Sequence, residues 1–160
     1  MNKKSHCCHM DEKPLVTIRK FKPKDINQIT KIEEQAFPKT AYSKQTFLNY
    51  GNNFPDTFSV IETGDDIAGY ILFDRGGHIH STAVKRIYRR MGFGRMLFMH
   101  AVKYARKRLW LEVRSKNSGA IAFYKSLGMK ITGKIPSYYG SDDALIMVMS
   151  QNDNYTNDKT

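Results

Sequence analysis

Apolar residues recur along this chain at two spacings, which predict strands and helices in a mixed order. Segments such as 15–21 (LVTIRKF) and 109–113 (LWLEV) alternate apolar with polar residues, as half-buried strands do. Ile26, Ile29 and Ile32 instead recur at helical spacing. The predicted strands are 15–21, 57–63, 67–73, 78–84, 109–113, 129–133 and 144–149. The predicted helices are 26–36, a short segment after Ser43, 92–107 and 120–127.

Local residues predict where these elements begin and end. Asp25 is expected to cap the first helix, and Gly51-Asn52-Asn53 is expected to break the second. Gly64-Asp65-Asp66 predicts an antiparallel hairpin between two β-branched runs, and Gly128 is expected to terminate the last helix.

The order of the elements indicates an α/β fold without repeats. Four strands precede the helix at 92–107, and another strand follows it. A strand, a helix and a second strand in succession favour parallel pairing of the two strands. We therefore expect a mixed, mostly antiparallel sheet of about six to seven strands.

Length and composition are those of one globular domain. The chain has 160 residues, of which 41% are hydrophobic and 12% aromatic, and no run reaches the ~18 apolar residues of a membrane span. Residues 1–13 and 151–160 are polar and aperiodic, so we expect flexible tails around a domain at 14–150. The start lacks the apolar core of a secretory signal, which predicts a cytoplasmic protein without membrane contact.

Cysteines are confined to the pair Cys7 and Cys8, which gives no disulfide framework and favours a reducing compartment. His6, Cys7, Cys8 and His9 are metal-ligand types, but four successive residues cannot easily surround a tetrahedral ion. We expect no metal.

Positive charge is concentrated around the main helix. The net charge of +11 favours anionic partners, including nucleotides, ribosomes and, non-specifically, nucleic acid. Many of the basic residues lie between 85 and 108, which indicates a local phosphate site, although a solvated helix face explains the later ones.

Before that helix comes a basic, glycine-containing turn, Tyr88-Arg89-Arg90-Met91-Gly92-Phe93-Gly94. Glycines let the backbone approach a ligand, and a helix start presents unpaired N–H groups that suit a pyrophosphate. The spacing excludes a Walker loop, which needs GxxxxGK[ST].

This turn resembles the coenzyme A-binding motif (Q/R)xxGx(G/A) of the GNAT acetyltransferases. Two further blocks resemble the RimI and Ard1-like protein N-terminal acetyltransferases within that superfamily. They are Leu111-Glu112-Val113-Arg114 with Asn117, Ala120, Phe123-Tyr124 and Leu127-Gly128-Met129, and then Tyr138-Tyr139 with Asp143-Ala144 and Met147.

The resemblance implies a GNAT fold, with helices on both faces of the sheet and a splayed central opening for acetyl-CoA between strands 78–84 and 109–113. It implies that the main chain near Ala83 and Val84 pairs with pantetheine. The residues implied at the phosphates are Arg89, Arg90, Met91, Gly92, Phe93, Gly94, Arg95 and Lys125. Asn117 is implied to contact the coenzyme, and it can also cap the following helix.

For the chemistry, the resemblance implies Glu112 as the general base and Tyr124 as the general acid. Strand alternation turns Glu112 away from the apolar face, where it can instead form an ion pair with a neighbour. Tyr124 shares a helical face with apolar residues, so a packing role is the alternative. His78 is the alternative base, because certain Ard1-like relatives use a tyrosine at the corresponding position.

Aromatic residues near both ends of the domain complete the candidate site. Phe37, Pro38, Tyr42, Tyr138 and Tyr139 resemble walls that hold the first residues of a peptide, although aromatic packing also explains them. The substrate implied is a protein or peptide α-amine, and a ribosomal protein is one candidate. A polyamine-like small amine and a catalytically silent acyl-CoA sensor or ribosome-binding module are the alternatives.

Overall fold

The computed structural model describes residues 14–105 and 108–150. The predicted tails and the His6–His9 tetrad lie outside the described residues. The described strands are β1 (Val16–Lys20), β2 (Phe58–Thr63), β3 (Asp66–Phe73), β4 (Ile79–Val84), β5 (Arg108–Arg114), β6 (Lys130–Tyr139) and β7 (Asp142–Ser150). The helices are α1 (Ile26–Ala36), α2 (Lys44–Asn53), α3 (Phe93–Tyr104) and α4 (Ser118–Ser126), with short 3₁₀ turns η1 (Pro23–Asp25) and η2 (Arg86–Tyr88).

The strands form two antiparallel sheets, in the orders β1-β2-β3-β4 and β5-β7-β6. Between the sheets, a single parallel bridge joins His78 to Trp110 among the described residues. The expected mixed, mostly antiparallel arrangement is therefore confirmed, and the predicted parallel relation of β4 to β5 is limited to this point of contact.

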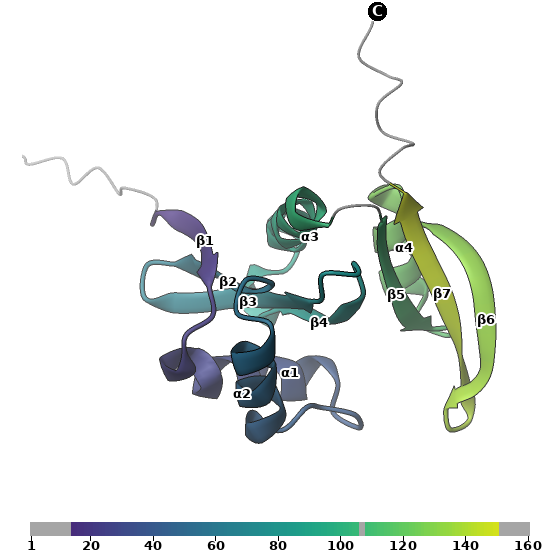
Figure 1. The fold of residues 1–160 in the computed structure, drawn as a ribbon, viewed down its shortest axis with the longest axis horizontal. Coiled ribbons are helices and arrows are strands. Elements are labelled where there is room, and N and C mark those ends of the chain that lie inside the picture. Colours follow the sequence, from purple (N-terminus) through teal and green to yellow (C-terminus); the bar gives the residue numbers. More distant parts are fainter. Residues whose placement is uncertain (1–13, 106–107, 151–160) are drawn as a thin grey trace, which may run out of the picture.

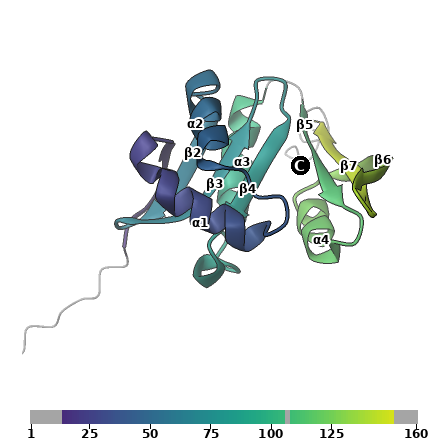
Figure 2. The ribbon, with the colours of Figure 1, turned by 90° about the horizontal axis from the view of Figure 1, so that it is seen from below.

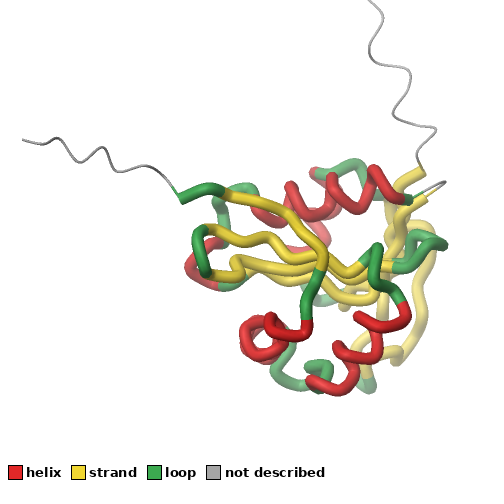
Figure 3. Tube along the Cα trace, turned by 60° about the vertical axis from the view of Figure 1, so that its left-hand side comes forward, coloured by secondary structure: helices red, strands yellow, loops and turns green. Residues whose placement is uncertain are grey.

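Helices cover both faces of the first sheet (Figure 1). α1 and α2 lie below it and α3 lies above it, while β5, β7 and β6 stand to one side with α4 packed against them. Figure 2 shows the same arrangement from below, with β4 and β5 diverging from one another. In Figure 3, the helices flank the strands of the first sheet on opposite sides.

Two apolar clusters hold these layers together. One lies between α3 and the upper face of the sheets, and includes Leu97, Phe98, Leu109 and Met147. The other lies beneath the first sheet, where Phe47 of α2 packs with Ile29 and Tyr70. Because the first cluster spans both sheets, burial of its apolar surface holds β5 near β4, although strand pairing between them is limited to the His78–Trp110 bridge among the described residues.

Asp25 does not cap α1 as predicted. Its carboxylate accepts hydrogen bonds from the Arg19 guanidinium at 2.8 Å and from the Lys22 backbone N–H at 2.8 Å. Burial alone raises the pKa of this carboxyl, but these partners lower it overall. Asp25 therefore forms a buried ion pair with Arg19 of β1 instead of capping α1.

α2 ends at Asn53, within the segment expected to break it, but Gly51 itself does not break the helix, which continues through it. A Cβ atom at Gly51 would lie 2.6 Å from Cε1 of Phe21. The glycine thus permits close packing of α2 on Phe21, and Ser43 caps the helix by accepting a hydrogen bond from the Thr46 N–H at 3.1 Å.

β6 is longer than the predicted strand 129–133, and it ends at Tyr139. Its pairing with β7 shifts register near Gly133 and between Ile135 and Tyr139. Tyr138 and Tyr139 consequently lie at the far end of β6, next to the turn into β7.

Candidate active site

The two sheets touch at Gly77 and separate beyond it. The Trp110 N–H donates to the Gly77 carbonyl oxygen at 2.9 Å. Gly77 has a φ of 84°, and a Cβ atom there would lie 1.8 Å from the Arg108 carbonyl oxygen. A glycine is therefore required for β4 and β5 to meet. β4, which follows Gly77, forms the open edge of its sheet.

His78 and Glu112 face one another across this junction. His78 Nε2 lies 2.7 Å from Glu112 Oε2, which is within hydrogen-bonding range. The His78 ring stacks on Trp110 at 3.8 Å with an interplanar angle of 8°. The side chains of His78 and Glu112 are largely buried, with 20% and 15% of their surface exposed, respectively. The structure thus brings together the two residues that the sequence proposed as alternative bases.

Asp74 and His80 extend this pair into a polar cluster. One Asp74 oxygen accepts from the His78 backbone N–H at 3.1 Å, and the other lies 3.0 Å from His80 Nε2. The Tyr50 hydroxyl lies 3.4 Å from His80 Nδ1. Burial and then the neighbouring His78 lower the pKa of His80.

The glycine turn leads from β4 into α3. Arg90 and Gly92 have φ values of 65° and 85°, so a residue in the left-handed region stands on each side of Met91. Such alternation turns successive backbone N–H groups toward one side, as in anion-binding nests. Gly92 occupies the start of α3 without a side-chain cap. Main-chain amides here can hold phosphates.

Side chains in this turn have different roles. Phe93 is buried with Leu97 and Tyr88 in the core cluster, so only its main chain can serve the phosphates. Arg89 Nε donates to the Val84 carbonyl oxygen at 3.1 Å. The Arg90, Met91 and Arg95 side chains are exposed.

Tyr124 lies on α4 against the apolar cluster beneath the opening. Its ring is 6.4 Å from that of Phe98 and 5.3 Å from that of Phe123. Burial, and then the neighbouring Tyr139, raise the pKa of Tyr124 to about 12. The phenol is therefore protonated at neutral pH, as a proton donor must be, and its packing role is present as well.

Three of the five residues predicted to form walls around the start of a peptide, here called the slot, gather around the opening. The Tyr42 hydroxyl lies 3.5 Å from the His80 carbonyl oxygen, and the Tyr139 hydroxyl lies 3.4 Å from that of Glu112. Tyr138 packs edge-on against Tyr139 at 4.8 Å. Burial raises the pKa of Tyr42 to about 12, and Tyr138 is close enough to contribute to this shift.

The other candidate residues lie outside the polar cluster and the group of tyrosines. Phe37 ends α1 and is half-buried, whereas Pro38 is exposed. Asn117 caps α4, because its side-chain oxygen accepts from the Ala120 N–H at 3.1 Å. Ala83 and Val84 pair with Tyr70 and Gly69 of β3, and Lys125 is exposed on α4.

Residues 26–129 match the model of the acetyltransferase (GNAT) family. The chain belongs to that family. It is therefore an acetyl-CoA-dependent acetyltransferase, as the sequence predicts. The match covers α1 to α4, and so includes the glycine turn and the residues at the junction of the sheets.

Named relatives place this acetyltransferase more finely within the family. It is 32% identical to an N-alpha-acetyltransferase of Sulfurisphaera tokodaii, over 81% of this chain and 90% of that one. It is 33% identical to the [Ribosomal protein bS18]-alanine N-acetyltransferase of Escherichia coli, over 83% and 96% of the two chains. The structure of Ard1 from Thermoplasma volcanium superposes with a TM-score of 0.76 at 31% identity, covering 84% of this chain and 97% of Ard1.

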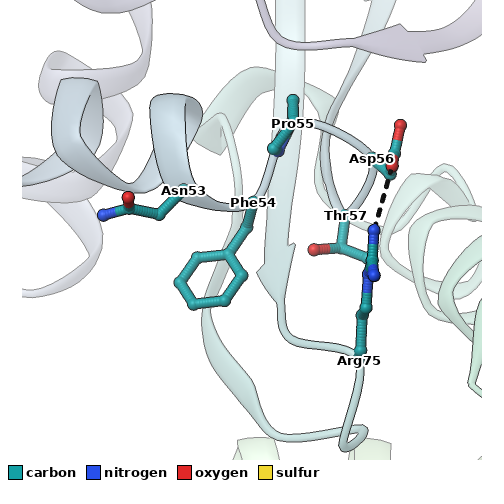
Figure 4. Close-up of a pocket in the computed structure, with 6 residues that line it drawn as sticks. All are labelled: Asn53, Phe54, Pro55, Asp56, Thr57 and Arg75. Atoms are coloured by element: carbon teal, nitrogen blue, oxygen red, sulfur yellow. Dashed lines mark ion pairs between the residues drawn. The ribbon is translucent and has the colours of Figure 1, made fainter.

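A small pocket lies beside the histidine cluster, where Phe54 stacks near His80 at 6.1 Å (Figure 4). It is lined by Asn53, Phe54, Pro55, Asp56, Thr57 and Arg75. Its volume of about 20 Å³ suits roughly one water molecule, so it cannot hold a coenzyme.

No helix in the described part of the chain is long and apolar enough to cross a membrane.

Sequence reasoning missed Asp74 and Tyr50, which complete the cluster around the histidines. Asp74 directly follows β3, just before Gly76-Gly77, and an acidic residue at a strand end is a usable signal for a site. Tyr50 offered no such signal, because its approach to His80 depends on how α2 packs beneath β4.

Proposed function

We propose that this enzyme acetylates the α-amine of a protein or peptide N-terminus. The observation that carries the proposal is the His78–Glu112 pair, which stands at the junction of the splayed sheets with Tyr42, Tyr138 and Tyr139 around the opening. The N-alpha-acetyltransferase and the ribosomal-protein acetyltransferase among its relatives support an N-terminal substrate.

Acetyl-CoA would bind along β4 and the glycine turn. The amides around Arg90 and Gly92 would hold the pyrophosphate, and the positive end of the α3 dipole would favour its negative charge. The exposed side chains of Arg90, Arg95 and Lys125 can reach further phosphates. The open edge of β4 near Ala83 and Val84 provides main-chain groups for pantetheine.

In the reaction, the substrate nitrogen attacks the acetyl carbonyl carbon and the bond between that carbon and sulfur breaks. Glu112 removes a proton from the amine, directly or through His78, since their side chains are hydrogen-bonded. Tyr124 gives its proton to the departing thiolate, because burial keeps the phenol protonated. The products are the N-acetyl peptide and coenzyme A.

The same geometry leaves either Glu112 or His78 as the group that first receives the proton. If His78 receives it, the 2.7 Å contact with the Glu112 carboxylate stabilises the resulting imidazolium. If Glu112 receives it, His78 orients the carboxylate. Trp110 restricts the imidazole to one plane in both cases.

Tyrosines would hold the start of the peptide. The hydroxyls of Tyr42 and Tyr139 lie at long hydrogen-bonding distances from carbonyls on β4 and β5, so both can turn to a peptide main chain. The edge-on contact between Tyr138 and Tyr139 gives this wall a fixed shape.

A ribosomal substrate fits the charge of the protein. A net charge of +11 attracts ribosomal RNA and repels polycations, so the field favours a ribosome-associated peptide over a polyamine. A cytoplasmic location would give access to such substrates and stays a prediction.

The deciding experiment is an assay with acetyl-CoA, a peptide library with varied first residues, and polyamines. We expect a mass increase of one acetyl group on peptides, at the α-amine. Peptides whose N-terminus is already blocked but which contain lysine provide the matched control. Product on polyamines alone would favour the small-amine alternative, and coenzyme binding without any product would favour the silent sensor.

A further inference from the structure

Asp74, His78 and His80 form a cluster with the composition of a metal site. Each offers one ligand atom, and these atoms all lie within 4.8 Å of one another. All three residues are partly buried, at the start of β4 and the turn before it. We propose that they bind a divalent transition-metal ion beside Glu112, and that the bound ion inhibits acetyl transfer.

Each histidine has one ring nitrogen directed to a partner outside the cluster. His78 Nε2 contacts the Glu112 carboxylate at 2.7 Å, and His80 Nδ1 lies 3.4 Å from the Tyr50 hydroxyl. Metal-bound histidines commonly donate their second N–H to such a carboxylate or hydroxyl, which fixes the ring and its tautomer. His78 Nδ1 and His80 Nε2 are then the ligand atoms, together with an Asp74 oxygen.

The three ligand atoms lie within 4.8 Å of one another and must close to the spacing of a tetrahedral site. Zinc bonds of about 2.0–2.2 Å place tetrahedral ligand atoms about 3.3 Å apart, and His80 Nε2 already lies 3.0 Å from Asp74 Oδ2. The two imidazole rings are 4.3 Å apart. On binding, the ion would replace the proton in the hydrogen bond between His80 Nε2 and Asp74 Oδ2.

Ligand chemistry selects the class of ion. Two imidazoles with one carboxylate suit Zn²⁺, Co²⁺, Ni²⁺ or Cu²⁺, whereas Mg²⁺ and Ca²⁺ prefer sites made of oxygen atoms. Three protein ligands also leave a coordination position open for water or a substrate amine.

The inhibitory effect rests on the proposed function of His78 and Glu112. An ion on Nδ1 occupies the second ring nitrogen of His78, whose Nε2 already contacts the Glu112 carboxylate, so His78 has no free nitrogen for the amine. An amine entering the opening can also be trapped at the free coordination position. The ion is thus an inhibitor of the reaction, not one of its cofactors.

The binding test separates this site from the N-terminal tetrad. The chain has five histidines, of which His6 and His9 belong to that tetrad. In the full-length protein with His6→Ala, Cys7→Ser, Cys8→Ser and His9→Ala, titration calorimetry with ZnSO₄ should show one ion per chain. Co²⁺ should give the visible absorption of a low-coordinate site.

Three variants of this background locate the ion. Asp74→Asn, which preserves shape, and His80→Ala should each weaken Zn²⁺ binding at least tenfold. His100→Ala is the matched control and should bind normally, since His100 is a half-buried histidine on α3 that hydrogen-bonds to Ser59 of β2, outside the cluster. Circular dichroism checks the fold of each variant. No binding, or binding that survives both Asp74→Asn and His80→Ala, overturns the proposal.

An activity measurement tests the consequence independently. At a free Zn²⁺ concentration tenfold above the dissociation constant, the initial rate measured by product mass should fall roughly tenfold and recover with EDTA. Equal inhibition of Asp74→Asn would overturn the inhibitory role. Because calorimetry needs neither acetyl-CoA nor peptide, the site can fail while the proposed function stands, and the reverse also holds.

Discussion

The backbone N–H of Trp110 donates to the carbonyl oxygen of Gly77 at 2.9 Å, and this contact joins the two sheets. It lies directly beside His78, whose ring stacks on Trp110. The position of the candidate base therefore depends on a main-chain contact between β5 and the turn before β4, and that contact depends on a glycine.

Gly77→Ala should strongly destabilise the protein, because the new methyl group would meet the Arg108 carbonyl oxygen in a left-handed residue. Urea unfolding should show a loss of roughly 2 kcal/mol or more beyond that of Gly64→Ala. Gly64 is the matched control, since it also has a positive φ of 60° but open space around its Cβ position. Equal losses in the two variants would mean that the contact with Arg108 can relax.

Much of this arrangement could be predicted from local sequence. The order of strands and helices follows from apolar periodicity, and the hairpin at Gly64 and the end of α4 at Gly128 follow from glycine chemistry. Gly51 misled the prediction, because its reason is the distant Phe21 ring rather than a turn.

Relationships between distant residues account for what the sequence could not predict in the site. Asp74 meets both histidines through the bend before β4, and Gly77 acquires its role only against Arg108. The resemblance supplied Glu112 and His78 as alternatives, and the structure adds that they are hydrogen-bonded partners. Their catalytic roles stay predictions.

Gly94→Glu should abolish coenzyme A binding, because it adds bulk and negative charge at the start of α3. The position is already tight, since a Cβ atom there would lie 3.1 Å from Cζ of Phe123. Calorimetry should show at least a tenfold loss of affinity. Gln35→Glu adds the same charge at an exposed position of α1, and this variant should bind coenzyme A normally. Unchanged affinity in folded Gly94→Glu would exclude the turn as the phosphate site.

Tyr124→Phe should lower turnover roughly tenfold or more while coenzyme affinity stays nearly constant, because it removes the proton donor and keeps the ring. Tyr104→Phe, at an exposed position on α3, is the control. The pKa of Tyr124 is raised to about 12, so the donor is protonated below that pH and lost above it. Deprotonation of Tyr124 should therefore cause no decline in the wild-type rate between pH 7 and 10. Full activity of Tyr124→Phe would leave the residue a packing role only.

Glu112→Gln and His78→Gln should identify which partner takes the amine proton. A substrate α-amine has a pKa of about 7.7–8.0, so it enters increasingly neutral as the pH rises. The deficit of the variant lacking the base should shrink between pH 7 and 9.5, whereas a variant that only disturbs positioning should keep a constant deficit. Initial rates on one peptide across this range decide the matter. Wild-type rates in both variants would place the base elsewhere.

Tyr138→Ala should reduce use of peptides without reducing use of small amines. Tyr138 is 50% exposed, packs edge-on against Tyr139, and lies near enough to Tyr42 to affect its pKa. Its loss would remove one wall of the slot, and the weakened hold on the peptide should lower kcat/KM about two- to tenfold, in line with the loss of roughly 0.5–1.5 kcal/mol. Tyr104→Ala is matched in exposure, at 51%, but lies on α3, so it should leave peptide use unchanged. The ratio of peptide to small-amine turnover is the quantity to measure, because a fault in coenzyme binding lowers both rates together. If Tyr138→Ala and Tyr42→Ala leave both that ratio and the first-residue preference intact, selection of the α-amine does not reside in these tyrosines, and the small-amine alternative gains the advantage.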